Sequence, residues 1–169
     1  INWYSSISNP KVHMNIKAKH NNVFIEGSDG ELATLFIDCI GDNLILDNGQ
    51  LFIYEGPYWT ADKNNSKIKK MINEVLNKII VGEIDILNKE EYSKEQQTRI
   101  QLFTKLRISI NSINKIKNIL EFVKFRIEED EYNLDTHKPN YFCFKNCAFN
   151  LDTAKQVQVN KYDYISQHT

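Results

Sequence analysis

The sequence predicts an α+β fold that is mainly helical, with a β-hairpin after the first helix and a second short hairpin near the C-terminus. Two observations predict it. Apolar residues recur at helical spacing in four stretches, and an Asn-Gly pair separates two short apolar runs. The composition is that of a globular chain: of 169 residues, 41% are hydrophobic and 25% are charged, with a formal net charge of −1. No apolar run reaches the length of a membrane span.

The first predicted helix begins after Ser28. Ser28 and Glu31 have the spacing of a capping box, in which each side chain accepts a hydrogen bond from the other residue's backbone N–H. Apolar residues then follow at helical spacing as far as Ile40, and Gly41 is a natural stop.

Three more helices are predicted in the middle of the chain. The second begins near Asn65, and its apolar residues repeat at i, i+3, i+4 and i+7 until Gly82, where we expect it to end. Ser93 with Gln96 caps the third helix, and Ser112 restarts the chain as a fourth. The apolar stripe of the fourth helix is expected to consist of Ile113, Ile116, Leu120, Val123 and Ile127.

The strands are predicted at two places. Residues 44–46 and 51–54 flank Asn48-Gly49, which is the strongest short hairpin signal. Near the C-terminus, residues 141–144 are strand-like and residues 156–159 alternate like an exposed strand. A further short strand is possible at residues 23–25.

The order of elements predicts one α+β domain over residues 27–169, preceded by a leading segment or linker over residues 1–26. Because the chain opens at Ile1 without an initiator Met, we expect it to be a piece of a longer protein.

No catalytic motif is present: the sequence has no phosphate-binding loop, no dinucleotide fingerprint, no zinc-protease helix and no nucleophile elbow. We therefore expect this segment not to be an enzyme and to hold no cofactor. Three cysteines are too few for a disulfide scaffold, which favours a reducing compartment.

Two metal sites can be imagined, and each has a more ordinary interpretation. A zinc site would lack the usual paired spacing, so cysteines in the core are the simpler interpretation. Its ligands would come from Cys143, Cys147, His137 and His168. A metal-dependent nuclease would use Asp38, Asp42 and Asp47. Because their spacing spreads them over a helix end and a strand, a solvated acidic surface is the simpler interpretation.

Positive charge is concentrated in two helical segments. Residues 63–78 carry five lysines against one glutamate, and residues 99–126 carry seven basic residues against one glutamate. Such segments could form a track for a phosphate backbone, although lysine also fills solvent-exposed helix faces by default. The candidate nucleic-acid-binding residues are Lys63, Lys67, Lys69, Lys70, Lys105, Arg107, Lys115 and Lys117.

Trp59 is a ninth candidate, because an aromatic ring beside lysines could stack on an unpaired base. The alternative is that Trp59 fills the core, which is the usual place for so large a ring.

Five stretches, in this order, resemble a known module. They are Gly-x-Leu-Ala-x-x-Phe at 30–36, Leu-Phe-Ile-Tyr-Glu-Gly-x-x-Trp-x-x-Asp at 51–62, and the segments 134–142, 146–153 and 163–169. The module is the accessory domain that precedes the helicase in the phage/plasmid primase family and in poxvirus-type primase–helicases. The chain departs from the usual pattern at Cys147, where that family has Gly, and at Asn150, where it has Asp.

The resemblance implies that the parent protein is an ATP-dependent superfamily 3 DNA helicase, a hexameric ring that acts in DNA replication and is often fused to a primase. This segment would be a non-catalytic domain that supports ring assembly or engages single-stranded or forked DNA. Its partners would be that DNA and the neighbouring subunits of the hexamer, with no membrane. ATP and Mg²⁺ would bind in the helicase domain, after Thr169.

The same resemblance, together with the Ile, Asn and Lys bias of the sequence, implies a large double-stranded DNA virus. The location would then be the viral factory in the host cytoplasm. The alternative to a DNA-engaging domain is a structural protein–protein interaction module that binds no nucleic acid.

Overall fold

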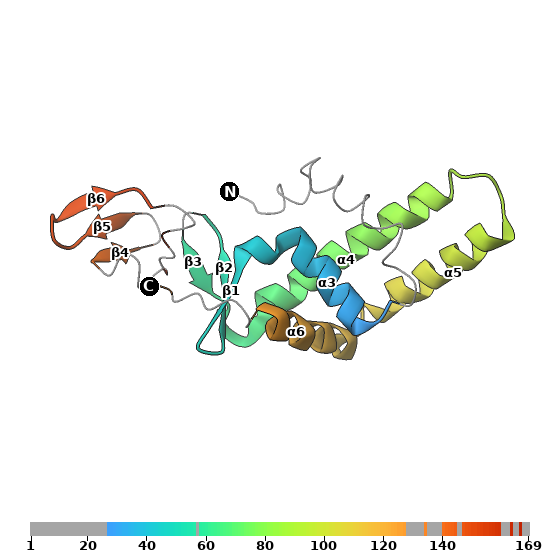
Figure 1. Ribbon diagram of the computed structural model, residues 1–169, viewed down its shortest axis with the longest axis horizontal. Coiled ribbons are helices and arrows are strands. Elements are labelled where there is room, and N and C mark those ends of the chain that lie inside the picture. Colours follow the sequence, from blue (N-terminus) through green and yellow to red (C-terminus); the bar gives the residue numbers. More distant parts are fainter. Residues whose placement is uncertain are drawn as a thin grey trace. The chain divides into compact units, whose positions relative to one another are not determined.

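The computed structural model describes residues 27–56, 58–127, 134, 140–144, 147–159, 163 and 166. Within them it confirms a mainly helical α+β fold (Figure 1). The α-helices are α3 (Asp29–Ile40), α4 (Ser66–Leu87), α5 (Lys94–Ser109) and α6 (Ile113–Ile127). The strands are β1 (Leu44–Asp47), β2 (Gln50–Tyr54), β3 (Trp59–Ala61), β4 (Tyr141–Cys143), β5 (Ala148–Asn150) and β6 (Lys155–Val157). Two short 3-10 helices, Gly41–Asn43 and Lys63–Asn65, precede β1 and α4.

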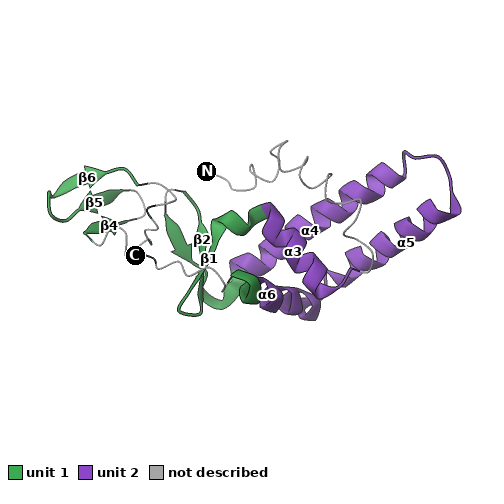
Figure 2. Ribbon diagram, in the orientation of Figure 1, with its two compact units in different colours: residues 1–5, 40–66, 124–169 green, residues 6–39, 67–123 purple. Residues whose placement is uncertain are grey.

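The chain divides into two compact units (Figure 2). The sheet unit is the described part of residues 40–66 and 124–169, and it contains all six strands. The helical unit is the described part of residues 6–39 and 67–123, and it contains most of the four helices.

The capping box predicted at the start of α3 is confirmed. Ser28 Oγ accepts a hydrogen bond from the Glu31 N–H at 3.3 Å, and Glu31 Oε2 accepts one from the Ser28 N–H at 3.2 Å. The Glu31 carboxylate also accepts the Gly27 N–H at 3.0 Å. The backbone N–H groups of Gly27, Ser28 and Glu31 have no carbonyl acceptor within the helix, and these two side chains supply the acceptors instead. The following residues bury one face of α3: Leu32, Ala33, Leu35 and Phe36.

Helix α4 is longer than predicted. We expected it to end at Gly82, and it continues to Leu87. Glycine inside a helix costs only about 1 kcal/mol relative to alanine, so it does not end a helix whose packing continues. The packing does continue here, because Leu87 is buried at the end of α4.

The predicted cap of α5 is confirmed, and the predicted stripe of α6 needs one correction. Ser93 and Gln96 form a capping box at the start of α5. On α6, Ile113 is 69% exposed, whereas Ile119, which was not predicted to be in the stripe, is fully buried. Ile113 is the first residue of the helix and lies beyond the part of α6 that packs. The buried stripe of α6 is Ile116, Ile119, Leu120, Val123 and Ile127.

The first predicted hairpin is confirmed and gains a third strand. Near the C-terminus, the two predicted strands are present in part as β4 and β6, but they do not pair with each other, because β5 lies between them. The first sheet has the order β1-β2-β3 and the second the order β4-β5-β6, with antiparallel pairing throughout. The β1–β2 turn places Asn48 at φ 49° and Gly49 at φ 76°, the left-handed conformation that an Asn-Gly hairpin turn requires. Strands β3 and β5 were not predicted, because each has only three residues and neither alternates clearly. The predicted strand at residues 23–25 lies outside the described residues.

The sheet unit has two small apolar clusters. In one, Ile45, Trp59 and Leu134 are buried together. In the other, Tyr58 packs with Cys143 and Ala148, so that the loop before β3 covers one face of the second sheet. Burial, with a smaller contribution from the two nearby thiols of Cys143 and Cys147, raises the pKa of the Tyr58 hydroxyl above its ordinary value. Tyr58 is therefore a neutral core residue at physiological pH.

Candidate nucleic-acid interface

Three of the predicted basic residues lie in the first two turns of α4. Lys67 and Lys70 are exposed and Lys69 is half-buried. Their spacing follows from the apolar pattern of the helix, in which Ile68 and Met71 face the core. Because residues three apart share a helix face, Lys67 and Lys70 present their charges on the same side of α4.

The turn between α5 and α6 is held against α4 by one side chain. Asn73 Nδ2 donates to the Ile110 carbonyl at 2.9 Å and to Asn111 Oδ1 at 3.2 Å. Lys70 precedes Asn73 by three residues, and Arg107 precedes Ile110 by three, which is about 4.5 Å along each helix axis at the standard helical rise. Because α4 and α5 run in opposite directions (Figure 1), these two steps lead away from each other, so Lys70 and Arg107 lie on opposite sides of the Asn73 contact.

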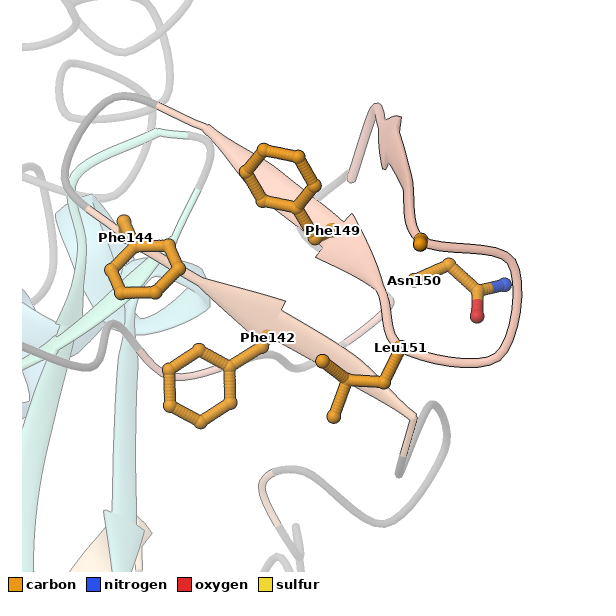
Figure 3. Close-up of a pocket in the computed structure, with 6 residues that line it drawn as sticks. Phe142, Phe144, Phe149, Asn150 and Leu151 are labelled. Atoms are coloured by element: carbon orange, nitrogen blue, oxygen red, sulfur yellow. The ribbon is translucent and has the colours of Figure 1, made fainter.

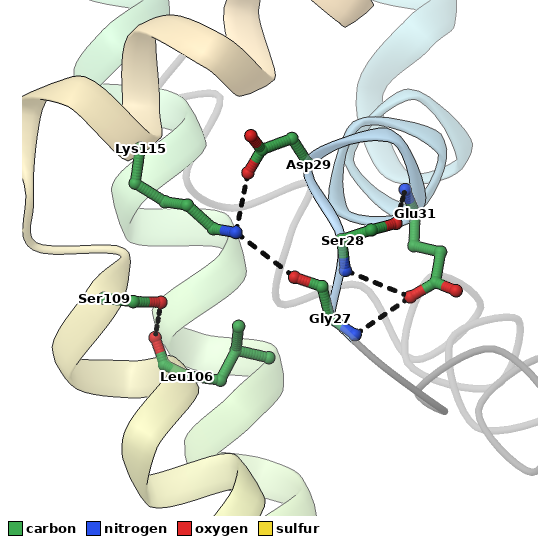
Figure 4. A network of polar contacts seen from close by, with 7 residues as sticks. All are labelled: Gly27, Ser28, Asp29, Glu31, Leu106, Ser109 and Lys115. Atoms are coloured by element: carbon green, nitrogen blue, oxygen red, sulfur yellow. Dashed lines mark hydrogen bonds and ion pairs between the residues drawn. The ribbon is translucent and has the colours of Figure 1, made fainter.

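The Lys115 side chain is engaged in contacts within the protein (Figure 4). Its ammonium forms an ion pair with Asp29 Oδ1 at 2.6 Å and donates a hydrogen bond to the Gly27 carbonyl at 3.3 Å. Both charged side chains are only 23% exposed. Lys115 thus fastens α6 to the first turn of α3, and its charge is largely balanced by Asp29.

Replacing Lys115 is expected to lower the stability of the helical unit. Lys115→Met keeps the aliphatic length and removes the ion pair and the hydrogen bond, which should cost about 1 kcal/mol in the free energy of unfolding. The measurement is urea denaturation followed by circular dichroism. Lys117→Met, at an exposed position on the same helix, is the matched control and should change stability by less than about 0.5 kcal/mol. Equal losses in the two variants would contradict the structural role of Lys115.

The remaining lysine and arginine candidates are exposed but are not all in one unit. Lys105, Arg107 and Lys117 are exposed in the helical unit. Lys63 is exposed in a 3-10 helix of the sheet unit. The structure therefore groups seven of the eight basic candidates in the helical unit and leaves Lys63 in the other.

Trp59 requires a correction. Its side chain is only 2% exposed and packs among Ile45 and Leu134, with its ring 5.3 Å from the ring of Tyr54 at an angle of 52°. A ring enclosed on its faces has no surface to offer a base. The alternative interpretation, that Trp59 fills the core, is the one that the structure supports.

The sequence analysis overlooked a group of aromatic residues on the second sheet (Figure 3). Phe142 on β4 and Phe149 on β5 are directly paired across the strands, and Phe144 follows at the end of β4. Together with Leu151 they line a shallow hollow of about 490 Å³. The available signal was the Phe-x-Phe spacing, which places both rings on one face of a strand.

Neither imagined metal site gains support from the structure. Among the described residues, no group of three or more His, Cys, Asp or Glu side chains is placed to hold a metal ion. Neither Cys143 nor Cys147 forms a disulfide, and Cys143 is buried in the core. His137 and His168 lie outside the described residues.

Comparison with known protein families decides the assignment. A family model described as D5 N terminal like matches residues 33–169. The chain belongs to the D5_N family. D5_N is the N-terminal domain of D5-like primase–helicases, so the resemblance noted in the sequence is confirmed.

The match covers the described strands and all but the first turn of α3. Residues 33–169 correspond to the accessory D5_N domain, and the catalytic helicase domain is not part of this chain. No helix in the described part of this D5_N domain is long and apolar enough to cross a membrane.

Proposed function

We propose that this D5_N domain is a non-catalytic part of a replicative superfamily 3 primase–helicase, in which it engages single-stranded DNA and supports assembly of the hexameric ring. Membership of the D5_N family supports the association with a primase–helicase. The parent would bind ATP and Mg²⁺ in its helicase domain and would act in viral factories in the host cytoplasm.

The observation that carries the DNA-binding half of the proposal is the placement of basic residues in the helical unit. Lys67 and Lys70 are exposed one turn apart on α4, and Arg107 is exposed near the end of α5, whose following turn Asn73 holds beside α4. Several positive charges within a few helical turns can contact successive phosphates, and the release of condensed counterions then drives binding. Binding of this kind is sensitive to salt. It is also independent of DNA sequence, which suits a helicase that moves along DNA.

Reversing the charges of Lys67 and Lys70 together is expected to weaken DNA binding. For the full chain and a fluorescein-labelled single strand of twenty thymidines, the Lys67→Glu, Lys70→Glu double variant should reduce the slope of log K against log salt by about 1.4, since each contacted phosphate contributes about 0.7. The affinity should fall by about tenfold or more. Fluorescence anisotropy between 25 and about 200 mM salt measures both quantities.

The matched control reverses two lysines near the other end of the α4–α5 helical pair. Lys89 follows α4, Lys94 begins α5, and both are exposed. Lys89→Glu with Lys94→Glu gives the same net charge as the test variant. Glutamates at 67, 70 and 94 lie near helix starts, where the helix dipole favours acidic residues, and Lys89 lies in the turn between the helices, so both variants should fold. An equal loss of binding in the two variants would show a general charge effect and would contradict a localised interface.

The second candidate function is a structural interaction module without nucleic-acid binding. The specific observation in its favour is that Ile108 and Ile113, at the two sides of the α5–α6 turn, are both largely exposed. Exposed aliphatic side chains next to a turn are suited to packing on another protein subunit. This function predicts no affinity for the thymidine strand at low salt, together with self-association that Ile108→Ser and Ile113→Ser abolish in analytical ultracentrifugation.

A further inference from the structure

One face of the second sheet packs against Tyr58, and among the described residues nothing covers Phe144 on the other face, which stays partly exposed. Along β4, Tyr141 and Cys143 point to the face that packs against Tyr58. Phe142 alternates with them and so lies on the opposite face, and Phe144, the residue after β4, lines the same hollow as Phe142. Phe149, the cross-strand partner of Phe142, lies on that open face as well. We call Phe142, Phe144, Phe149 and Leu151 the aromatic face.

The rings of the aromatic face are accessible and close together. Phe144 is 47% exposed, and its ring centroid is 5.2 Å from that of Phe142 at an angle of 56°. Figure 3 shows the three rings along the β4–β5 pair, with Leu151 at the end where the chain turns. Asn150 and Ala154 complete the lining of the hollow. Apolar side chains gathered on an open sheet face in this way are typical of a binding surface.

We propose that the aromatic face binds unpaired bases of single-stranded DNA by stacking. Two aromatic residues at i and i+2 of one strand, with a third on the neighbouring strand, form the platform on which sheet-based binders of single strands stack two or three bases. Phe142 and Phe149 are cross-strand partners, and Phe144 follows two residues after Phe142, just beyond the end of β4. Rings that are tilted toward each other suit successive bases that have been splayed apart.

The polar residues around the platform fit this occupant. Gln156 on β6 is the register partner of Phe149 and shares its face, so its amide can donate to and accept from a base edge. Lys155, the neighbouring residue on β6, pairs with Asn150 and so belongs to the opposite face of the sheet. The nearby acid, Asp152, accepts a hydrogen bond from Asn140 at 2.6 Å. A surface with aromatic rings and an amide offers partners to the ring and to the edge of a base.

This inference rests on the proposed function, because it assigns a second, base-contacting site to the same DNA-binding activity. The two can be separated, since the lysines of α4 contact phosphates and the aromatic face contacts bases. A strand of twenty abasic residues keeps the phosphates and lacks the bases. The lysine double variant should lose affinity for both strands, whereas a change in the aromatic face should affect only the strand with bases.

The test compares the full chain with Phe144→Leu and Phe144→Tyr. Leucine keeps an apolar side chain and removes the ring, and tyrosine keeps the ring. For the labelled strand of twenty thymidines, Phe144→Leu should raise Kd by about fivefold or more at unchanged salt slope, and Phe144→Tyr should bind as the unaltered chain does. Neither variant should change binding to the abasic strand. Near-UV circular dichroism checks that both variants keep the fold.

The control is Phe125→Leu on α6, where the ring is 65% exposed but has no place in the sheet. It should leave Kd unchanged. The inference alone is overturned if Phe144→Leu binds the thymidine strand as tightly as the unaltered chain. It is also overturned if the leucine variant retains DNA binding but loses self-association, because the face would then dock a protein. The titration begins at about 25 mM salt. If the unaltered chain does not bind the thymidine strand even there, the DNA-binding function is rejected, and this site is rejected with it.

Discussion

Trp59→Ala is expected to lower the free energy of unfolding by about 3–5 kcal/mol, the usual cost of truncating a buried tryptophan. The ring is almost fully buried, packs with Ile45 and Leu134 and contacts Tyr54. Trp59 is also the first residue of β3, paired with Tyr54, so the cavity would open beside the strand that completes the first sheet. Urea denaturation followed by far-UV circular dichroism measures the loss.

The control for Trp59 is a residue of similar kind on the surface. Tyr92 is 79% exposed, and Tyr92→Ala should change the free energy of unfolding by less than about 0.5 kcal/mol. Trp59→Phe should be intermediate, because it leaves a smaller cavity. If Trp59→Ala were as stable as the unaltered chain and bound single-stranded DNA more weakly, the base-stacking interpretation would be correct and the burial of Trp59 would not describe the molecule in solution.

Gln96→Ala is expected to lower the free energy of unfolding by about 2–4 kcal/mol, a large effect for a polar residue. Its Oε1 accepts the Ser93 N–H at 3.2 Å, and its Nε2 donates to the Leu87 carbonyl and, at 3.2 Å, to the Glu90 carbonyl. The residue is itself buried. Truncation removes one of the two hydrogen bonds of the capping box and leaves up to two carbonyls without this donor, each of which carries a desolvation penalty of about 1–3 kcal/mol where it stays buried.

The matched control for Gln96 is the next residue along the chain. Gln97 is exposed on the same turn of α5, so Gln97→Ala should change the free energy of unfolding by less than about 0.5 kcal/mol. Gln96→Glu should also be strongly destabilising, because a carboxylate keeps the acceptor for Ser93 but cannot donate to the two carbonyls. A loss from Gln96→Ala no larger than that from Gln97→Ala would mean that the amide does not hold the α4–α5 connection.

The candidate site was only partly accessible from the sequence. The basic residues were identified because charge can be counted along a chain, but their roles depend on which elements pack together. Lys115 was grouped with the DNA-binding candidates, and the structure gives it a partner 88 residues away in the backbone of Gly27. The aromatic face was missed because its phenylalanines come from two separate segments. Phe142 and Phe144 lie in or just after β4, whereas Phe149 lies on β5, which was not predicted.

The sequence by itself determined the elements whose signals act over three or four residues. The capping boxes at Ser28 and Ser93 and the Asn48-Gly49 turn are formed by neighbours in the chain, so their geometry follows from residue type alone. The order of short motifs was likewise sufficient to identify the D5_N family.

Only the tertiary structure decided what depends on packing between distant segments. The continuation of α4 through Gly82, the burial of Trp59 and the ion pair of Lys115 with Asp29 each reflect contacts that residue type does not encode. Burial is a property of the assembled fold, because an apolar ring or a lysine is equally compatible with the core edge or the surface until its neighbours are in place. The same reason explains why the open face of the second sheet emerged as a binding surface only once β4, β5 and β6 were seen side by side.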